Sequence, residues 1–211
     1  MLPCYLTIKR FGEMETIIQK SRFIAHVSRA ETEEEALEFI QKIKKQHSQA
    51  THNCSAYMIG ENDQIQKAND DGEPSGTAGI PILEVLKKRK LKDTVVVVTR
   101  YFGGIKLGAG GLIRAYGKTA SAGIESAGIV KRQLMRVIHT KSDYTWLGKL
   151  ENEIRSSHFI LREIKYLETI EILTLVEEGQ DQAFKEWITE MTNGQSEFEQ
   201  GELLYLETEI Q

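Results

Sequence analysis

The amino-acid sequence predicts a two-domain α+β protein, and three features of the chain lead to this expectation. Segments typical of strands and helices are mixed through residues 1–130. The segments after residue 131 follow the order β-α-β-β-α-β, which is the ferredoxin-like pattern. The charge also changes, because residues 1–133 hold 20 Lys and Arg against 15 Asp and Glu, a net +5, whereas residues 134–211 hold 7 against 16, a net −9. We therefore expect one domain over residues 1–130 and a second over residues 131–211.

The elements of the first domain follow from hydrophobic periodicity and from turn and cap residues. Thr32 is an N-cap candidate with Glu35 three residues later, and the four valines from Val95 predict a strand buried on both faces. In chain order we expect two strands within 14–30, a helix over 31–49, paired strands over 52–60 and 65–70, a short helix over 80–90, a strand over 94–102 and a helix over 110–128.

The second domain has clearer alternation. Leu147, Leu150 and Ile154 lie on one side of a helix, and a glycine ends the last helix. We expect a strand over 133–144, a helix over 145–157, strands over 159–167 and 169–178, a helix over 181–194 and a strand over 198–208.

Bulk composition places the chain among ordinary globular proteins. It is 40% hydrophobic and 27% charged, which is typical of a folded soluble domain rather than a disordered one. No run of about 18 apolar residues is present, so the sequence predicts no membrane span. The N-terminus, MLPCYLTIKRFGEMET, has no apolar run long enough for a signal peptide. Cys4 and Cys54 have no CxxC partner, which predicts free thiols in a reducing, cytoplasmic setting.

The glycine-rich stretch TRYFGGIKLGAGGLIRAYG, residues 99–117, follows a strand and opens a helix. A helix start has unpaired backbone N–H groups, and glycine allows an anion to approach them. The phosphate motifs GxxxxGK[ST] and GxGxxG are both absent. Two interpretations stay open: Arg100, Lys106 and Arg114 surround an anion site, or the glycines only permit a tight turn and close helix packing.

The polar loop DDGEPSGTAG, residues 70–79, is the second candidate. Its acidic residues are able to hold Mg²⁺ or to act as a general base, and Ser75 or Thr77 is able to serve as a nucleophile. Loops of this composition more often form turns and cap helices. His47, His52 and Cys54 lack the further ligands that zinc needs. One of these histidines can still line a site, because His52 and Cys54 share a strand face.

Aromatic residues beside the cations have two possible roles. Tyr101, Phe102 and Tyr116 are able to stack on bases or to be core, and we expect Phe102 to be core more than the tyrosines. Trp146 and Trp187 lie on expected helices and are interpreted as core.

Four blocks resemble the signature of the Impact family, in its bacterial YigZ/YvyE branch. They are KSRFIAHV (20–27), ATHNCSAY (50–57), DDGEPSGTAG (70–79) and VVVVTRYFGGIKLGAGGLIRAYG (95–117). The resemblance implies an N-terminal α/β sandwich like that of a ribosomal protein and of GHMP kinases. It also implies a C-terminal ferredoxin-like domain similar to the last domain of elongation factor G.

The resemblance also implies a function and a surface. Eukaryotic Impact proteins regulate translation through an additional N-terminal RWD domain, for which we expect no room in this chain. We expect a non-enzymatic regulator of translation that binds RNA or the ribosome, with no metal and no cofactor. The alternative is a small-molecule enzyme acting on a phosphorylated compound or nucleotide. The residues expected at the anion-binding surface are Arg100, Tyr101, Gly103, Gly104, Lys106, Gly108, Gly110, Gly111 and Arg114, and those of the adjacent acidic loop are Asp70, Asp71, Glu73, Ser75, Gly76 and Thr77.

Overall fold

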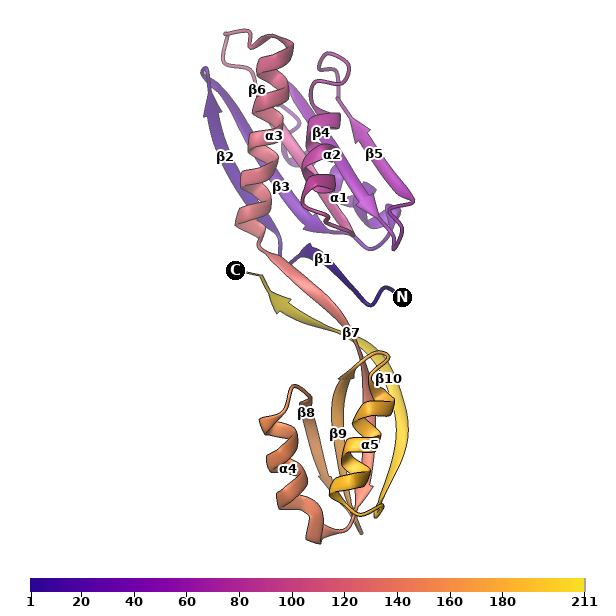
Figure 1. The fold of residues 1–211 in the computed structure, drawn as a ribbon. Helices are drawn as coiled ribbons and strands as arrows, with labels where there is room; N and C mark the ends of the chain where they lie inside the picture. Colours follow the sequence, from indigo (N-terminus) through magenta and orange to yellow (C-terminus); the bar gives the residue numbers. More distant parts are fainter. Residues whose placement is uncertain (211) are drawn as a thin grey trace. The chain divides into compact units, whose positions relative to one another are not determined.

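A computed structural model describes residues 1–210, which form two compact units (Figure 1). The N-terminal unit contains Tyr5–Arg132 and the end of the chain from Thr208. The C-terminal unit contains Met1–Cys4 and Gln133–Glu207. The predicted two-domain α+β class is confirmed. The domain ranges 1–130 and 131–211 stay a prediction.

One antiparallel sheet of five strands forms the centre of the N-terminal unit. Its order is β2-β3-β6-β4-β5, and β6 lies in the middle. All of β6 except its last residue is buried, which confirms the expectation from the valine run. The strands are β2 (Gly12–Ile18), β3 (Ser21–Arg29), β4 (His52–Ile59), β5 (Ile65–Asn69) and β6 (Thr94–Tyr101).

Helices cover both faces of this sheet. On one face, α1 (Glu33–Gln46) packs through Ala36, Ile40 and Ile43. Its predicted cap is confirmed, since the Thr32 side chain accepts a hydrogen bond of 3.2 Å from the N–H of Glu35.

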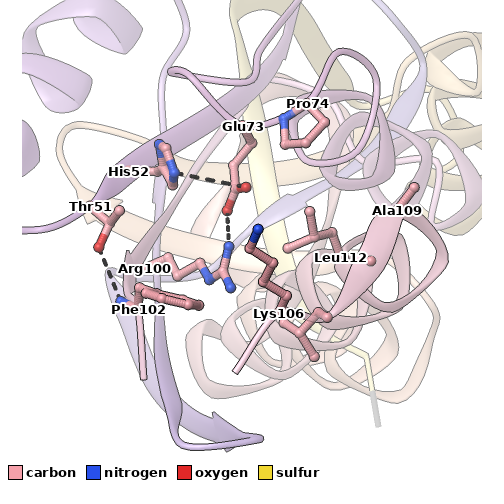
Figure 2. Close-up of a pocket in the computed structure, with 11 residues that line it drawn as sticks. Thr51, His52, Glu73, Pro74, Arg100, Phe102, Lys106, Ala109 and Leu112 are labelled. Carbon is pink, nitrogen blue, oxygen red and sulfur yellow. Dashed lines mark hydrogen bonds and ion pairs between the residues drawn. The ribbon is translucent and has the colours of Figure 1, made fainter. Parts of the chain in front are cut away.

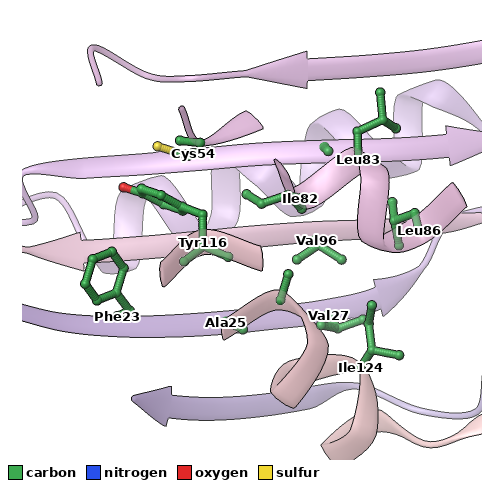
Figure 3. Packing of buried hydrophobic residues seen from close by; sticks show 14 of the residues in the cluster. Phe23, Ala25, Val27, Cys54, Ile82, Leu83, Leu86, Val96, Tyr116 and Ile124 are labelled. Atoms are coloured by element: carbon green, nitrogen blue, oxygen red, sulfur yellow. The ribbon is translucent and has the colours of Figure 1, made fainter. Parts of the chain in front are cut away.

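The other face carries the larger core, under α2 (Gly79–Lys88) and α3 (Gly108–Ala127). Figure 3 shows Tyr116 and Ile124 of α3 among side chains of β3, β4, β6 and α2. A Cβ at Gly123 would lie 2.5 Å from the Cβ of Ala25, so glycine lets α3 approach β3 closely.

The sequence prediction missed one strand, β1 (Cys4–Ile8), which pairs with β7 (Ile129–Ser142). The segment CYLTI is short and has no turn residues that set it apart. Its pairing depends on a strand far along the chain, which local periodicity does not reveal.

The C-terminal unit has the predicted β-α-β-β-α-β order. Its strands lie in the order β10-β7-β9-β8, which is the ferredoxin-like arrangement 4-1-3-2. Leu150 and Ile154 of α4 and Phe184 and Ile188 of α5 are buried against the sheet. After β7 the elements are a 3₁₀ turn (Tyr144–Trp146), α4 (Leu147–Ser156), β8 (Ile160–Tyr166), β9 (Ile170–Glu177), α5 (Asp181–Met191) and β10 (Ser196–Glu209).

Neither unit has a helix, within residues 1–210, that is long and apolar enough to cross a membrane.

Candidate functional site

A pocket of about 450 Å³ lies in the N-terminal unit where the start of β4, the end of β6 and the start of α3 meet. The antiparallel pairing of β4 with β6 places His52 directly opposite Arg100, so the two strand ends share this site. The side chains of Glu73 and Lys106 also point toward it (Figure 2). The apolar part of the lining comes from Pro74, Phe102, Leu107, Ala109 and Leu112.

Glu73 and Arg100 form a buried ion pair at this pocket. Arg100 Nη1 donates to Glu73 Oε1 at 2.5 Å, and the side chains are 6% and 4% exposed respectively. The Tyr116 hydroxyl donates to the same Oε1 at 2.8 Å. The Arg100 guanidinium lies between two aromatic rings, 5.3 Å from the centre of Phe23 and 5.4 Å from that of Phe102. The Arg100 charge is therefore neutralised and held in place.

The second carboxylate oxygen of Glu73 is open. His52 Nε2 lies 3.8 Å from Oε2, which is too far for a hydrogen bond. Of residues 1–210, none donates a hydrogen bond to this oxygen. His52 Nδ1 lies 2.8 Å from the Asp71 carbonyl oxygen, so Nδ1 carries the hydrogen. In a neutral His52, Nε2 is then an acceptor facing Glu73.

Cys54 and Tyr116 are buried close to Glu73 and do not line the pocket. Burial raises the pKa of the Cys54 thiol to about 12, and its sulfur lies 2.9 Å from the Asp70 carbonyl oxygen. Burial also raises the pKa of Tyr116 strongly. Both groups stay protonated near neutral pH, which makes Cys54 a poor nucleophile.

The start of α3 lies at the opposite side of the pocket. Leu107 occupies the cap position with an apolar side chain, and Gly108, Ala109, Gly110 and Gly111 follow it. The first-turn N–H groups therefore have no side-chain cap, and the helix dipole favours an anion there. Lys106 is exposed and lines the same pocket.

Gly103 and Gly104 shape the connection before α3. A Cβ at Gly103 would lie 2.0 Å from the carbonyl carbon and oxygen of Lys20, in the turn between β2 and β3. Only glycine therefore fits against this turn. The Gly103 N–H also donates to Ser21 Oγ at 3.1 Å. Gly104 has a positive φ of 86° and an open environment.

The expected cations do not converge on one point. Arg100 is paired with Glu73, and Lys106 lines the pocket. Arg114 is exposed and lines a separate depression with Lys118. Tyr101 faces the other side of the sheet, where its hydroxyl lies 2.9 Å from Nδ1 of His47.

The expected roles of two aromatic residues are reversed in the structure. Phe102, expected in the core, is 46% exposed. Tyr116, considered for base stacking, is fully buried. The reason is position: Phe102 is the first residue after β6, whereas Tyr116 lies on the face of α3 that packs on the sheet.

In the acidic loop, Asp70 is a helix cap. It accepts hydrogen bonds from the N–H groups of Gly76, Ala78 and Gly79 at 2.8, 3.0 and 2.8 Å. Burial opposes ionisation of this carboxyl, yet the three N–H donors hold the pKa of Asp70 below its ordinary value.

Asp71 and Thr77 of this loop also form hydrogen bonds. Asp71 accepts from Lys44 at 2.7 Å and from the N–H of Asn53 at 2.6 Å. The Thr77 hydroxyl donates to the Pro74 carbonyl at 2.6 Å, and Ser75 is exposed. Only Glu73 and Pro74 of this loop line the pocket.

Sequence reasoning did not include Thr51, Pro74, Leu107, Ala109 and Leu112 in the site. From the sequence alone, His52 is a zinc candidate that lacks further ligands and a histidine able to line a site, without a link to Arg100. The strand pairing that brings His52 opposite Arg100 is the missing information.

Comparison with known proteins shows which family models and which relatives the chain matches. Residues 19–124 match the model of the Impact N-terminal domain, and residues 141–195 match a domain of unknown function, DUF1949. The chain is 68% identical over 210 residues to a Bacillus subtilis protein called IMPACT family member YvyE, covering 100% of this chain and 97% of that one. It is 36% identical over 195 residues to an IMPACT family member of Haemophilus influenzae, covering 90% and 93%.

A further relative and a solved structure are also similar to this chain. IMPACT family member YigZ of Escherichia coli is 43% identical over 102 residues, covering 47% of this chain and 50% of that one. A crystal structure described as a hypothetical protein aligns with a TM-score of 0.61 at 25% identity, covering 94% of this chain and 97% of that one.

Proposed function

This chain belongs to the Impact family, and from that premise we propose that it regulates translation by binding RNA or the ribosome. The contact is the start of α3 with the glycine-rich stretch before it. One observation carries this proposal: the first turn of α3 has no side-chain cap and lies beside the exposed Lys106. Backbone N–H groups and a nearby cation at a helix start suit a phosphate.

Neighbouring side chains support the same surface. Phe102 is exposed where it can stack on a base, and such a contact is worth about 1–3 kcal/mol. Arg114 and Lys118 extend the positive charge along α3. Arg100 is neutralised by Glu73, so in this proposal it supports the ring of Phe102 and does not contact phosphate.

The test is the binding of fluorescent RNA and of purified ribosomal subunits across a salt series. We expect the logarithm of the affinity to fall linearly with the logarithm of salt concentration. The variant Lys106→Ala/Arg114→Ala should bind more weakly and reduce the slope by about 1 for each cation removed.

The matched control is Lys42→Ala/Lys45→Ala, which removes two exposed lysines from α1 on the other face of the sheet. This control should bind like the unmodified protein. Binding that ignores salt, or no binding to any RNA or subunit, would contradict the proposal. Equal losses in the two double variants would contradict the location of the site.

A second candidate function is an enzyme acting on a phosphorylated compound or nucleotide. The observation in its favour is the pocket, in which His52 Nε2 and Glu73 Oε2 face each other as a possible base and its partner. Steady-state turnover of nucleotides and sugar phosphates, lost in His52→Ala, would support it. Absence of turnover across such substrates would exclude it.

A further inference from the structure

We propose that the pocket binds one phosphorylated ribose unit that carries a free 2′,3′-diol, as at the 3′ end of RNA. This inference rests on the proposed function and specifies what the same site binds. Three parts of the pocket carry it: two acceptors at its floor, a helix start at its opposite side and apolar walls between them.

Glu73 Oε2 and, in a neutral His52, Nε2 are two acceptors, and they call for two donors on the ligand. Glu73 Oε2 and His52 Nε2 lie 3.8 Å apart and face each other without a hydrogen bond. The Glu73 side chain is only 4% exposed and lines the pocket, so Oε2 is an acceptor that a ligand reaches through the pocket. A vicinal diol supplies two O–H groups at neighbouring positions, one for each acceptor. Carboxylates bind ribose hydroxyls in this way in other nucleotide sites.

The phosphate group has its own place. Lys106 lines the pocket together with Leu107, Gly108 and Ala109 of the uncapped α3 start. A phosphate there meets backbone N–H groups, the helix dipole and one cation. Asp70 and Asp71 of the acidic loop are bonded to other groups and do not line the pocket, so Lys106 is the charged side chain beside the start of α3.

The apolar walls of the pocket suit a nucleobase, and its volume suits one nucleotide. Pro74, Leu107 and Leu112 are apolar, and Phe102 offers the ring face that Arg100 does not cover. The volume of about 450 Å³ lies in the ordinary range for small-molecule pockets. Internal nucleotides of RNA lack the 3′-hydroxyl, so they cannot offer the diol.

A free nucleotide and an RNA end share this chemistry, and the experiment separates them. Calorimetry would compare adenosine 5′-monophosphate with its 2′,3′-dideoxy analogue. A fluorescent oligoribonucleotide with an ordinary 3′ end would be compared with one ending in a 2′,3′-dideoxynucleotide. We expect the ligand without the diol to bind about 10- to 100-fold more weakly in at least one pair.

Variants locate the effect without disturbing the ion pair of Glu73. His52→Ala should lose the preference for the diol, whereas Ser75→Ala, an exposed residue of the same loop outside the pocket lining, should keep it. Equal binding of the diol and dideoxy ligands in both pairs would overturn the inference. A diol preference that persists in His52→Ala would overturn the assignment to this pocket.

The two proposals can fail separately. Salt-sensitive RNA binding that ignores the 3′ end would leave the proposed function standing and remove this inference. Diol-dependent binding of the mononucleotide without any RNA binding would support the pocket and contradict the RNA function. Absence of both kinds of binding would contradict both.

Discussion

Glu73 and Arg100 form an ion pair in the interior of the N-terminal unit, with 2.5 Å between Oε1 and Nη1. Each partner is also held by neutral groups: Tyr116 donates to Glu73, and the rings of Phe23 and Phe102 flank Arg100. The pair connects the loop before α2 with the end of β6. Stability and site geometry therefore depend on the same contact.

Breaking this pair should be costly. Glu73→Gln leaves the Arg100 charge buried without a counter-charge, and we expect the free energy of unfolding to fall by about 3–5 kcal/mol. Denaturant unfolding measures this change. Glu15→Gln, which breaks the exposed pair with Arg22, is the control and should cost less than about 1 kcal/mol. Similar costs for the two variants would show that the Glu73 pair is not buried in solution.

Two glycines of the glycine-rich stretch should respond in opposite directions. Gly103→Ala places a Cβ 2.0 Å from the Lys20 backbone, and we expect a loss of about 3 kcal/mol in the free energy of unfolding. Gly110→Ala meets only Arg114 Nη1 at 3.7 Å within a helical turn, so it should gain about 0.5–1 kcal/mol. Thermal or denaturant unfolding of both variants is the measurement. An unchanged stability of Gly103→Ala would contradict the close approach of Gly103 to the turn between β2 and β3.

Asp70 should make stability depend on pH in the acid range. Its pKa is lowered in the folded protein by three backbone donors, against the effect of burial. A lowered pKa means that the folded state favours the ionised form. The stabilisation is therefore complete above the unfolded value of about 3.9 and is lost as pH falls through the folded value.

The comparison of wild type with Asp70→Asn tests this dependence by denaturant unfolding from neutral pH down to about pH 3, below the ordinary Asp pKa of about 3.9. Near neutral pH we expect the variant to be less stable by about 1–3 kcal/mol. The difference should shrink below about pH 4. Glu38→Gln on the exposed side of α1 is the control, with little difference at any pH. A difference that grows as pH falls would contradict the capping role.

Local chemistry was enough to predict most elements. The valine run gave a buried strand, and Thr32 with Glu35 gave the start of α1, because both signals act within a few residues. The pocket depends on contacts between distant residues. The resemblance to the Impact family places the acidic loop next to the glycine-rich stretch, but no local signal pairs Glu73 with Arg100 or brings His52 to either of them. For the same reason the exposure of Phe102 was predicted wrongly.

The missing strand β1 illustrates the same limit. Its five residues gain their conformation from pairing with β7, and the periodicity of so short a segment does not identify it. By contrast, the order of elements after residue 131 was sufficient for the ferredoxin-like arrangement, since that topology follows from few alternatives.

The central place of β6 has a consequence for how the chain acquires its structure during synthesis. β3 and β4 are made well before β6. Each can pair with its neighbour along the chain, β2 or β5, but the hydrogen bonds of its other edge form only when β6 is present. Such non-local pairing slows folding. Until it occurs, the run from Val95 to Val98 is an uncharged β-branched segment of the kind that promotes aggregation. The flanking Lys92, Asp93 and Arg100 provide charges on both sides of this segment, and charged residues in these positions discourage intermolecular strand pairing.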